Sequence, residues 1–206
     1  MLTLYYAPNT CALASHIALE DAGAEYETKR ISFQSGDQRS PGYLKINPKG
    51  RVPALVTDQG ILTETPAILA FVAQTHPQAK LAPQDAYGFA QIQAFNSYLC
   101  STVHVAHAHR PRGSRWADDP AAIEAMKAKV PQTMSECFAL IEGEMFKGPW
   151  VMGESYTICD PYLYTITRWL PGDGVDIAKF PRIQEHFRRM SERPSVKVAV
   201  EESGAS

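Results

Sequence analysis

The chain of 206 residues has no excess of charge of either sign and no basic stripe along its length. Its 20 Lys and Arg residues are balanced by 22 Asp and Glu residues, which gives a formal net charge of -2. Nucleic acid attracts proteins through clustered basic side chains, so this balance argues against nucleic acid as the main partner. No apolar run approaches the ~18 residues of a membrane span, so we expect no membrane association.

The sequence also lacks a Cys-x-x-Cys pair. Its four cysteines are far apart, at Cys11, Cys100, Cys137 and Cys159. The N-terminus has no basic region followed by an apolar core, which is the pattern of a secretory signal. Cysteines in this context are typical of reduced thiols and not of a disulfide framework, so we predict a cytoplasmic protein.

Residues 1–80 show alternating strand and helix patterns. Short apolar segments predict strands over 2–6, 26–31, 53–56 and 61–63. Helical spacing predicts one helix capped by Thr10 and ended by Gly23, and a second capped by Thr65. The first helix should connect two parallel strands, and 32–46 should be an irregular loop with at most short helical turns. This order predicts a small α/β sandwich with a mixed sheet.

From Ala86 onward the strand pattern disappears. Apolar spacing predicts a long helix that ends near 110–113 and further helices that begin after 119, 157, 180 and 193. Pro131 lies inside the helix that begins after 119 and should kink or split that helix. Thr157 and Asp160 have the spacing of a capping box. We predict an α/β domain over 1–80 and an all-helical domain over 86–206, joined by a linker that contains prolines.

Cys11 lies where the first helix begins. Free amide hydrogens and the helix dipole favour negative charge there, which predicts a thiol of lowered pKa and a site for thiol chemistry. The alternative is a small core residue, since free cysteine is among the most buried residue types. The stretch by itself does not decide between the two.

Glu64, Thr65 and Pro66 present a second helix N-terminus directly after a strand. The free amides there suit an anion, and the Glu64 carboxylate beside them suits an ammonium group. The alternative is ordinary helix capping with a surface glutamate.

Four motifs, in order and correctly spaced, together resemble the cytosolic glutathione transferases over essentially the whole chain. They are Tyr5 to His16, Asn47 to Leu55, Thr63 to Thr65 before a helix, and Tyr156 to Asp160 with Arg168 and Trp169. Cys11 in the first motif, together with His104 on the long helix, resembles the bacterial beta class of that family.

The resemblance implies a thioredoxin-like N-terminal domain that binds glutathione as co-substrate, an all-helical second domain and a homodimer. It implies a cis peptide at Val52-Pro53, with Val52 exchanging backbone hydrogen bonds with the cysteinyl part of glutathione. It assigns the γ-glutamyl end to Glu64 and Thr65, where the helix amides suit the carboxylate and Glu64 suits the ammonium group.

By the same resemblance, Cys11 and His104 lie beside the glutathione sulfur as the catalytic residues. Cys11 can donate a hydrogen bond to that sulfur, and His104 can orient or deprotonate the thiol because its ordinary pKa is near neutrality. Three positions differ from the family pattern. Ser97 stands where an asparagine is expected, with Asn96 one place off, and Val105 replaces a lysine. The loop after the second strand is shorter, so Arg39 is at most a candidate for contacting the glycine carboxylate.

The implied reaction is attack of the glutathione thiolate on a small hydrophobic electrophile, as in detoxification. The electrophile should lie where the two domains meet, with walls from Ala7, Pro8, Asn9, His107, Arg110, Trp116 and Trp169. Two alternatives remain open. One is glutathione-dependent disulfide exchange through Cys11, by a monothiol route because no second cysteine is near it in sequence. The other is a non-catalytic protein of the same fold.

A metal site is a further alternative, since His104 and His107 share a helical face and His109 is close. No carboxylate completes the set at helical spacing, so we predict no metal.

Overall fold

The computed structural model describes residues 1–204. Within them, four strands form one sheet in the order β2-β1-β3-β4. The strands are β1 (Leu2–Tyr6), β2 (Tyr26–Arg30), β3 (Ala54–Val56) and β4 (Ile61–Thr63). β1 is parallel to β2 and antiparallel to β3, which is antiparallel to β4. The predicted mixed sheet is confirmed, and its parallel pair requires the crossover through the first helix.

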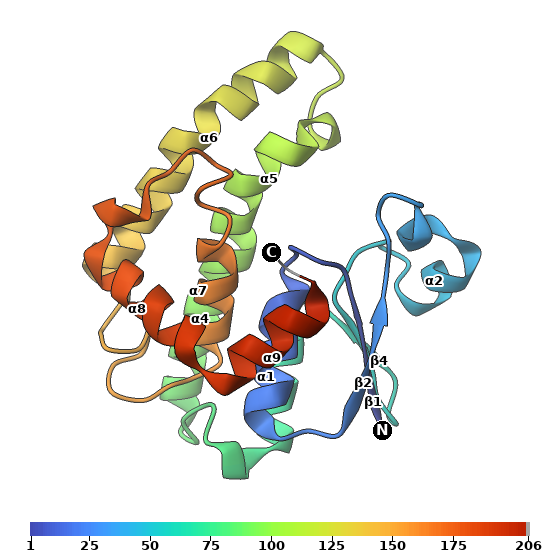
Figure 1. Ribbon diagram of the computed structural model, residues 1–206, viewed down its shortest axis with the longest axis vertical. Helices are drawn as coiled ribbons and strands as arrows, with labels where there is room; N and C mark the ends of the chain where they lie inside the picture. The colour runs from blue at the N-terminus through green and yellow to red at the C-terminus, as the bar shows by residue number, and fades with distance from the viewer. Residues whose placement is uncertain (205–206) are drawn as a thin grey trace.

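Helices cover both faces of this sheet. α1 (Ala12–Ala22) packs against α3 (Thr65–Thr75), and α2 (Pro41–Ile46) lies on the opposite side of the sheet from α1 (Figure 1). Gly23 ends α1 with a φ of 63°, as predicted for a left-handed cap. Besides α2, the segment 32–46 contains a 3-10 turn, Asp37–Arg39, so it is more helical than expected. The Ser40 hydroxyl caps α2 by accepting from the Tyr43 N–H at 3.2 Å.

The predicted caps of α1 and α3 are wrong by one residue. Cys11 and Glu64 precede the two helices, and neither side chain caps the backbone. Thr65 is already the first residue of α3. Thr10 accepts from the Ala12 N–H at 3.3 Å, but its hydroxyl also donates to the Ala7 carbonyl at 2.7 Å, so it stabilises the turn before the helix.

The rest of the described chain is helical, which confirms the predicted all-helical C-terminal part. The helices are α4 (Ala86–Tyr98), α5 (His104–Arg112), α6 (Pro120–Leu140), α7 (Cys159–Thr167), α8 (Pro181–Glu192) and α9 (Pro194–Ser203). A π-helical turn, Leu99–Val103, joins α4 to α5. α6 continues through Pro131, so the predicted split is absent: Val130 and Met134, on either side of it, are fully buried and hold the helix against the core.

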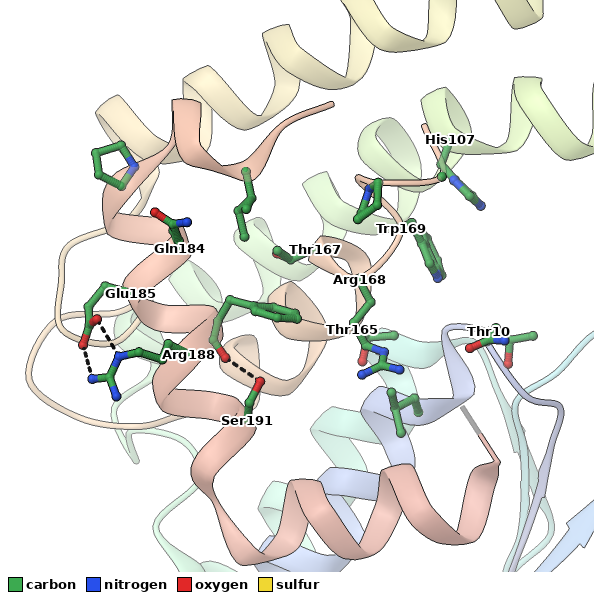
Figure 2. A pocket seen from close by; sticks show the side chains of 17 residues that line it. Thr10, His107, Thr165, Thr167, Arg168, Trp169, Gln184, Glu185, Arg188 and Ser191 are labelled. Atoms are coloured by element: carbon green, nitrogen blue, oxygen red, sulfur yellow. Dashed lines mark hydrogen bonds and ion pairs between the residues drawn. The ribbon is translucent and has the colours of Figure 1, made fainter. Parts of the chain in front are cut away.

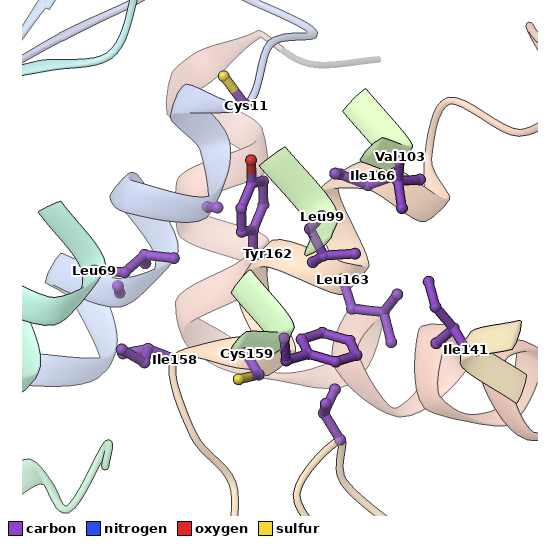
Figure 3. Close-up of a cluster of buried hydrophobic side chains, with 14 of the residues drawn as sticks. Cys11, Leu69, Leu99, Val103, Ile141, Ile158, Cys159, Tyr162, Leu163 and Ile166 are labelled. Atoms are coloured by element: carbon purple, nitrogen blue, oxygen red, sulfur yellow. The ribbon is translucent and has the colours of Figure 1, made fainter. Parts of the chain in front are cut away.

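One core connects the sheet part to the helical part. It contains Leu4 and Leu55 from the sheet together with Leu99, Phe138 and Tyr162 from the helices. Figure 3 shows Leu69 of α3 on one side of Tyr162 and Leu99 on the other, with Cys11 above the tyrosine ring. The first turn of α1 therefore lies directly against the helical part.

Asp160, at the start of α7, is fully buried and joins three segments. Its carboxylate accepts from the backbone N–H of Thr157 at 2.7 Å and of Val151 at 2.8 Å, and it pairs with His186 Nε2 at 3.0 Å. The Thr157 hydroxyl in turn accepts from the Cys159 N–H at 3.3 Å. The bond from the Thr157 N–H back to Asp160 is thus present as in the predicted capping box, but the residue that caps α7 is Ile158, one place later than predicted.

We expect Asp160→Ala to lower the free energy of unfolding by about 3–5 kcal/mol, because it leaves buried donors without an acceptor. Asp119→Ala is the matched control, since Asp119 caps α6 at an exposed position and its loss should cost only ~1 kcal/mol. Urea unfolding at neutral pH measures both. Equal losses in the two variants would contradict the role assigned to Asp160.

Candidate functional site

All six predicted site residues line one cavity of about 150 Å³. They are Cys11, Val52, Pro53, Glu64, Thr65 and His104. Cys11 comes from the β1–α1 turn, and Val52 and Pro53 come from the loop before β3. Glu64 and Thr65 come from the start of α3, and His104 from the start of α5. The cavity therefore lies where the sheet part meets the long helix.

Cys11 is a buried thiol and not the expected thiolate. Its S–H donates to the Val52 carbonyl at 3.7 Å. Burial raises the pKa of Cys11, and the Thr65 hydroxyl and the Arg112 charge only partly oppose this. The prediction of a lowered pKa is wrong because removal from water outweighs the helix N-terminus.

The loop that carries Val52 is fixed by side chains of the preceding segment. The Val52-Pro53 peptide is cis, as expected. The Tyr43 hydroxyl and the Asn47 amide both donate to the Arg51 carbonyl at 2.7 Å. These bonds hold the backbone of Val52 at the cavity wall.

Glu64 and Thr65 lie at the N-terminus of α3, and Glu64 has a φ of 74°. The first bond of the helix runs from the Ile68 N–H to the Glu64 carbonyl, so the earlier amides have no acceptor within the helix. The Lys49 ammonium bonds to the Glu64 carboxylate, and to the Thr63 hydroxyl at 2.8 Å. A cation thus occupies the place where Glu64 was expected to hold an ammonium group.

His104 begins α5, directly after the π-helical turn, and such turns are frequent at functional sites. Its Nε2 accepts from the Arg112 guanidinium at 3.2 Å, and its ring packs on Trp169 with centroids 4.9 Å apart. Burial, followed by the charge of Arg112, lowers the pKa of His104 to about 3. A neutral imidazole with this pKa is a weak base, so the structure favours orientation of a thiol over its deprotonation.

A second cavity of about 450 Å³ adjoins the first and shares Cys11, Val52 and His104 with it. Of the predicted electrophile walls, it contains Pro8, Asn9, His107 and Trp169. Trp116 lines the smaller cavity, whereas Ala7 and Arg110 line neither. His107 is fixed by a bond from its Nδ1 to Asp173 at 2.8 Å and by stacking on Trp169, with centroids 4.3 Å apart.

A third cavity, of about 960 Å³, lies on the far side of Trp169 between α7 and α8 (Figure 2). It shares Asn9, Thr10, His107 and Trp169 with the second cavity. Trp169 therefore forms a wall common to both.

The sequence pattern did not single out three residues that line the smallest cavity, namely Cys100, Arg112 and Tyr162. Cys100 lines the same cavity as Cys11, although the two cysteines are far apart in sequence. Cys100, His104, Ala108 and Arg112 follow one another at intervals of four residues, and all four line this cavity. Residues at this spacing share one face of a helix, so the sequence contained a pattern that places Cys100 and Arg112 on the face of His104.

Tyr162 is only 1% exposed. Its hydroxyl points toward Cys11 (Figure 3). Within residues 1–204 no hydrogen-bond partner of this hydroxyl is found. The ring of Tyr162 thus packs in the core while its hydroxyl faces the cavity. The apolar periodicity of the sequence does not distinguish these two environments.

The positions that depart from the family pattern lie in different environments. Ser97 is exposed, while Asn96 is fully buried with neither amide atom bonded. Val105 lines the smallest cavity and Arg39 the second one.

Residues 1–74 match the family model of the glutathione S-transferase N-terminal domain, and residues 102–194 match that of the C-terminal domain. The chain belongs to the glutathione S-transferase family. Glutathione S-transferase GstA of Escherichia coli O157:H7 is 29% identical to it over 210 residues, which covers 98% of this chain and 99% of GstA.

Solved structures of this family are similar over the whole chain. A glutathione transferase homolog from Sulfitobacter, with bound glutathione, is 46% identical with a TM-score of 0.95, and the match covers 100% of this chain and 99% of that one. The bacterial beta class glutathione S-transferase of Sphingomonas chungbukensis is 28% identical with a TM-score of 0.86, over 99% of this chain and 100% of that one.

Among residues 1–204, no helix is long and apolar enough to cross a membrane. In the same part of the chain, His, Cys, Asp and Glu side chains do not gather in groups of three or more that could hold a metal ion.

We expect the free energy of unfolding to fall as the pH drops from about 6.5, because the unfolded chain protonates His104 and the folded chain does not until about pH 3. The contribution is on the order of 1 kcal/mol per pH unit in this window. His104→Asn should remove this pH-dependent contribution. Between pH 7 and about 4.5, the free energy of unfolding of the variant, measured in urea, should therefore fall by ~2 kcal/mol less than that of the wild type. Parallel losses in the two proteins would contradict the neutral, buried state of His104.

Proposed function

We propose that this glutathione S-transferase family member conjugates glutathione to a small electrophile, as a cytoplasmic, homodimeric, detoxifying enzyme of the beta class. The observation that carries the proposal is the convergence of Cys11, Val52, Glu64, Thr65 and His104 on one cavity. The bound glutathione in the Sulfitobacter homolog, 46% identical over its full length, supports it.

The γ-glutamyl end of glutathione is placed at the start of α3 in this proposal. Its α-carboxylate accepts from the unbonded amides there, and its ammonium group binds Glu64 beside or instead of Lys49. Its cysteinyl residue bonds to the backbone of Val52. The Val52 carbonyl now accepts from Cys11, so binding of glutathione frees the Cys11 S–H.

The freed Cys11 S–H then donates to the glutathione sulfur. Because its pKa is raised, Cys11 stays protonated while the glutathione thiol loses its proton to solvent. The Tyr162 hydroxyl, aimed at the same place, provides a second donor, and the nearby Arg112 charge favours the thiolate. His104 orients this cluster as a neutral ring.

In the chemical step, the glutathione thiolate attacks an electrophilic carbon. A carbon–sulfur bond forms, and the leaving group departs with the electron pair of the bond that breaks. Holding the two reactants together in the cleft removes the entropy cost of their encounter, which is the protein's second contribution.

Glutathione-dependent disulfide exchange is a second candidate, and the presence of Cys100 and Cys11 in one cavity favours it. In its thiolate form, Cys11 would attack the glutathione sulfur of a disulfide that contains glutathione. The S–S bond of that disulfide breaks, its other thiolate leaves, and a second thiol would then release glutathione from Cys11. Turnover of hydroxyethyl disulfide without turnover of aryl halides would select this function. The non-catalytic alternative has no comparable observation in its favour, since the residues that the family resemblance assigns to glutathione line one cavity.

We expect reduced glutathione to bind the wild type in calorimetric titration, and Glu64→Ala to weaken binding more than about tenfold (~1.4 kcal/mol). The loss follows from removal of the one carboxylate placed for the ammonium group. Glu124→Ala, at an exposed position on α6, is the matched control and should bind as the wild type does. The proposal fails if the wild type shows no binding up to millimolar glutathione.

Cys11→Ala tests the thiol separately. We expect it to bind glutathione within a few-fold of the wild type, because the Val52 and α3 contacts remain. The pKa of bound glutathione, followed by thiolate absorbance, should rise because a donor to the sulfur is lost. An unchanged pKa would remove Cys11 from the catalytic role.

A further inference from the structure

Four arginines line the second cavity, and no Asp or Glu side chain lines it. Arg39 and Arg51 come from the sheet part, and Arg112 and Arg115 from the end of α5 and the turn that follows it. The cavity wall also contains Cys11, so this positive charge surrounds the place where the sulfur chemistry is proposed.

Within residues 1–204, none of the four arginines forms an ion pair. Arginines elsewhere do so: Arg193 pairs with Asp21 at 2.7 Å and Arg188 with Glu185 at 2.8 Å. Arg112 is half-buried, and its Nε is buried without a partner. Arg115 is exposed, but partial removal of its guanidinium from water, followed by the charges of Arg112, Arg51 and Arg39, lowers its pKa. Such a cluster repels itself until an anion enters it.

Glutathione supplies too little charge for this cluster. Its α-carboxylate and ammonium group are placed at the start of α3, outside the second cavity. Its thiolate, which the charge of Arg112 favours, and its glycine carboxylate are the groups left for the arginines. We place the glycine carboxylate on the sheet side of the cavity. Arg51 directly precedes Val52, which is proposed to bind the adjacent cysteinyl residue, and Arg39 lies against Gly50 of the loop that carries Val52. Arg112 and Arg115 then have no carboxylate partner on the helical side.

We propose that the electrophile accepted by this enzyme carries a carboxylate, bound by Arg112 and Arg115 beside Cys11 and His104. Planar guanidinium groups bind carboxylates in this way with two parallel hydrogen bonds. The apolar part of the molecule lies against the remaining walls of the cavity, which include Phe33, Pro111 and Trp169. This inference rests on the proposed transferase function and adds a carboxylate to the small hydrophobic electrophile expected from the family resemblance.

The test compares two acceptors that differ only in charge: chlorodinitrobenzoate, with its chlorine para to the carboxylate, and the corresponding chlorodinitrobenzamide. In both, the glutathione thiolate forms a bond to the ring carbon and chloride leaves with the electron pair. After each rate is divided by the uncatalysed rate, we expect kcat/KM of the wild type to favour the carboxylate by about tenfold or more. Added salt should reduce this preference.

Arg112→Gln and Arg115→Gln should each remove most of the preference, mainly by raising KM for the carboxylate. Arg39→Gln should instead weaken glutathione binding and leave the preference intact. Arg110→Gln is the matched control on the same helix: Arg110 lies 3.9 Å from Asp173 and lines neither of the two cavities, so this variant should behave as the wild type does.

Three results would overturn the proposal. In the first, the wild type has no preference for the carboxylate. In the second, the Arg112 and Arg115 variants keep the preference. In the third, these variants weaken glutathione binding and slow both acceptors equally, which assigns the arginines to the glycine carboxylate. Failure of the transferase function itself is distinguishable, because calorimetry would then show no glutathione binding and neither acceptor would react.

Discussion

The burial of helix α1 on every side is the constraint on which the site depends. Nearly all of its residues are buried, and it packs against α3, α7 and α9. A helix of this kind has no polar stripe and must be enclosed by the rest of the fold. Cys11 directly precedes α1, so the same packing removes the thiol from water and presses it toward Tyr162 (Figure 3).

This removal from water explains why the groups around the sulfur are neutral. Burial raises the pKa of the Cys11 thiol and lowers that of His104, so each is held in its uncharged form. The charge at the site is instead carried by the Glu64 carboxylate and by guanidinium groups, which keep their protons. A neutral pair of hydrogen-bonding groups inside a positive rim is suited to stabilising a thiolate that arrives with a substrate.

Much of the fold could be predicted because local rules decide it. Turn residues and apolar spacing located the strands, Gly23 ended α1, and Asp160 accepts from the Thr157 N–H as expected. The failures came where packing overrides local preference. Pro131 does not divide α6, since its neighbours Val130 and Met134 are anchored in the core. The start of α3 moved by one residue because Glu64 adopts a positive φ.

For the site, the sequence by itself determined which side chains and turns are available: a cysteine before a helix, a Val-Pro step before a strand, and Glu64 with Thr65 before another helix. It also determined the spacing of Cys100, His104, Ala108 and Arg112 at intervals of four residues. The protonation of Cys11 and His104, and the gathering of four arginines from two parts of the chain, were decided by the tertiary structure alone. The physical reason is that desolvation and Coulomb interactions depend on distances through space, and residues remote in sequence set those distances.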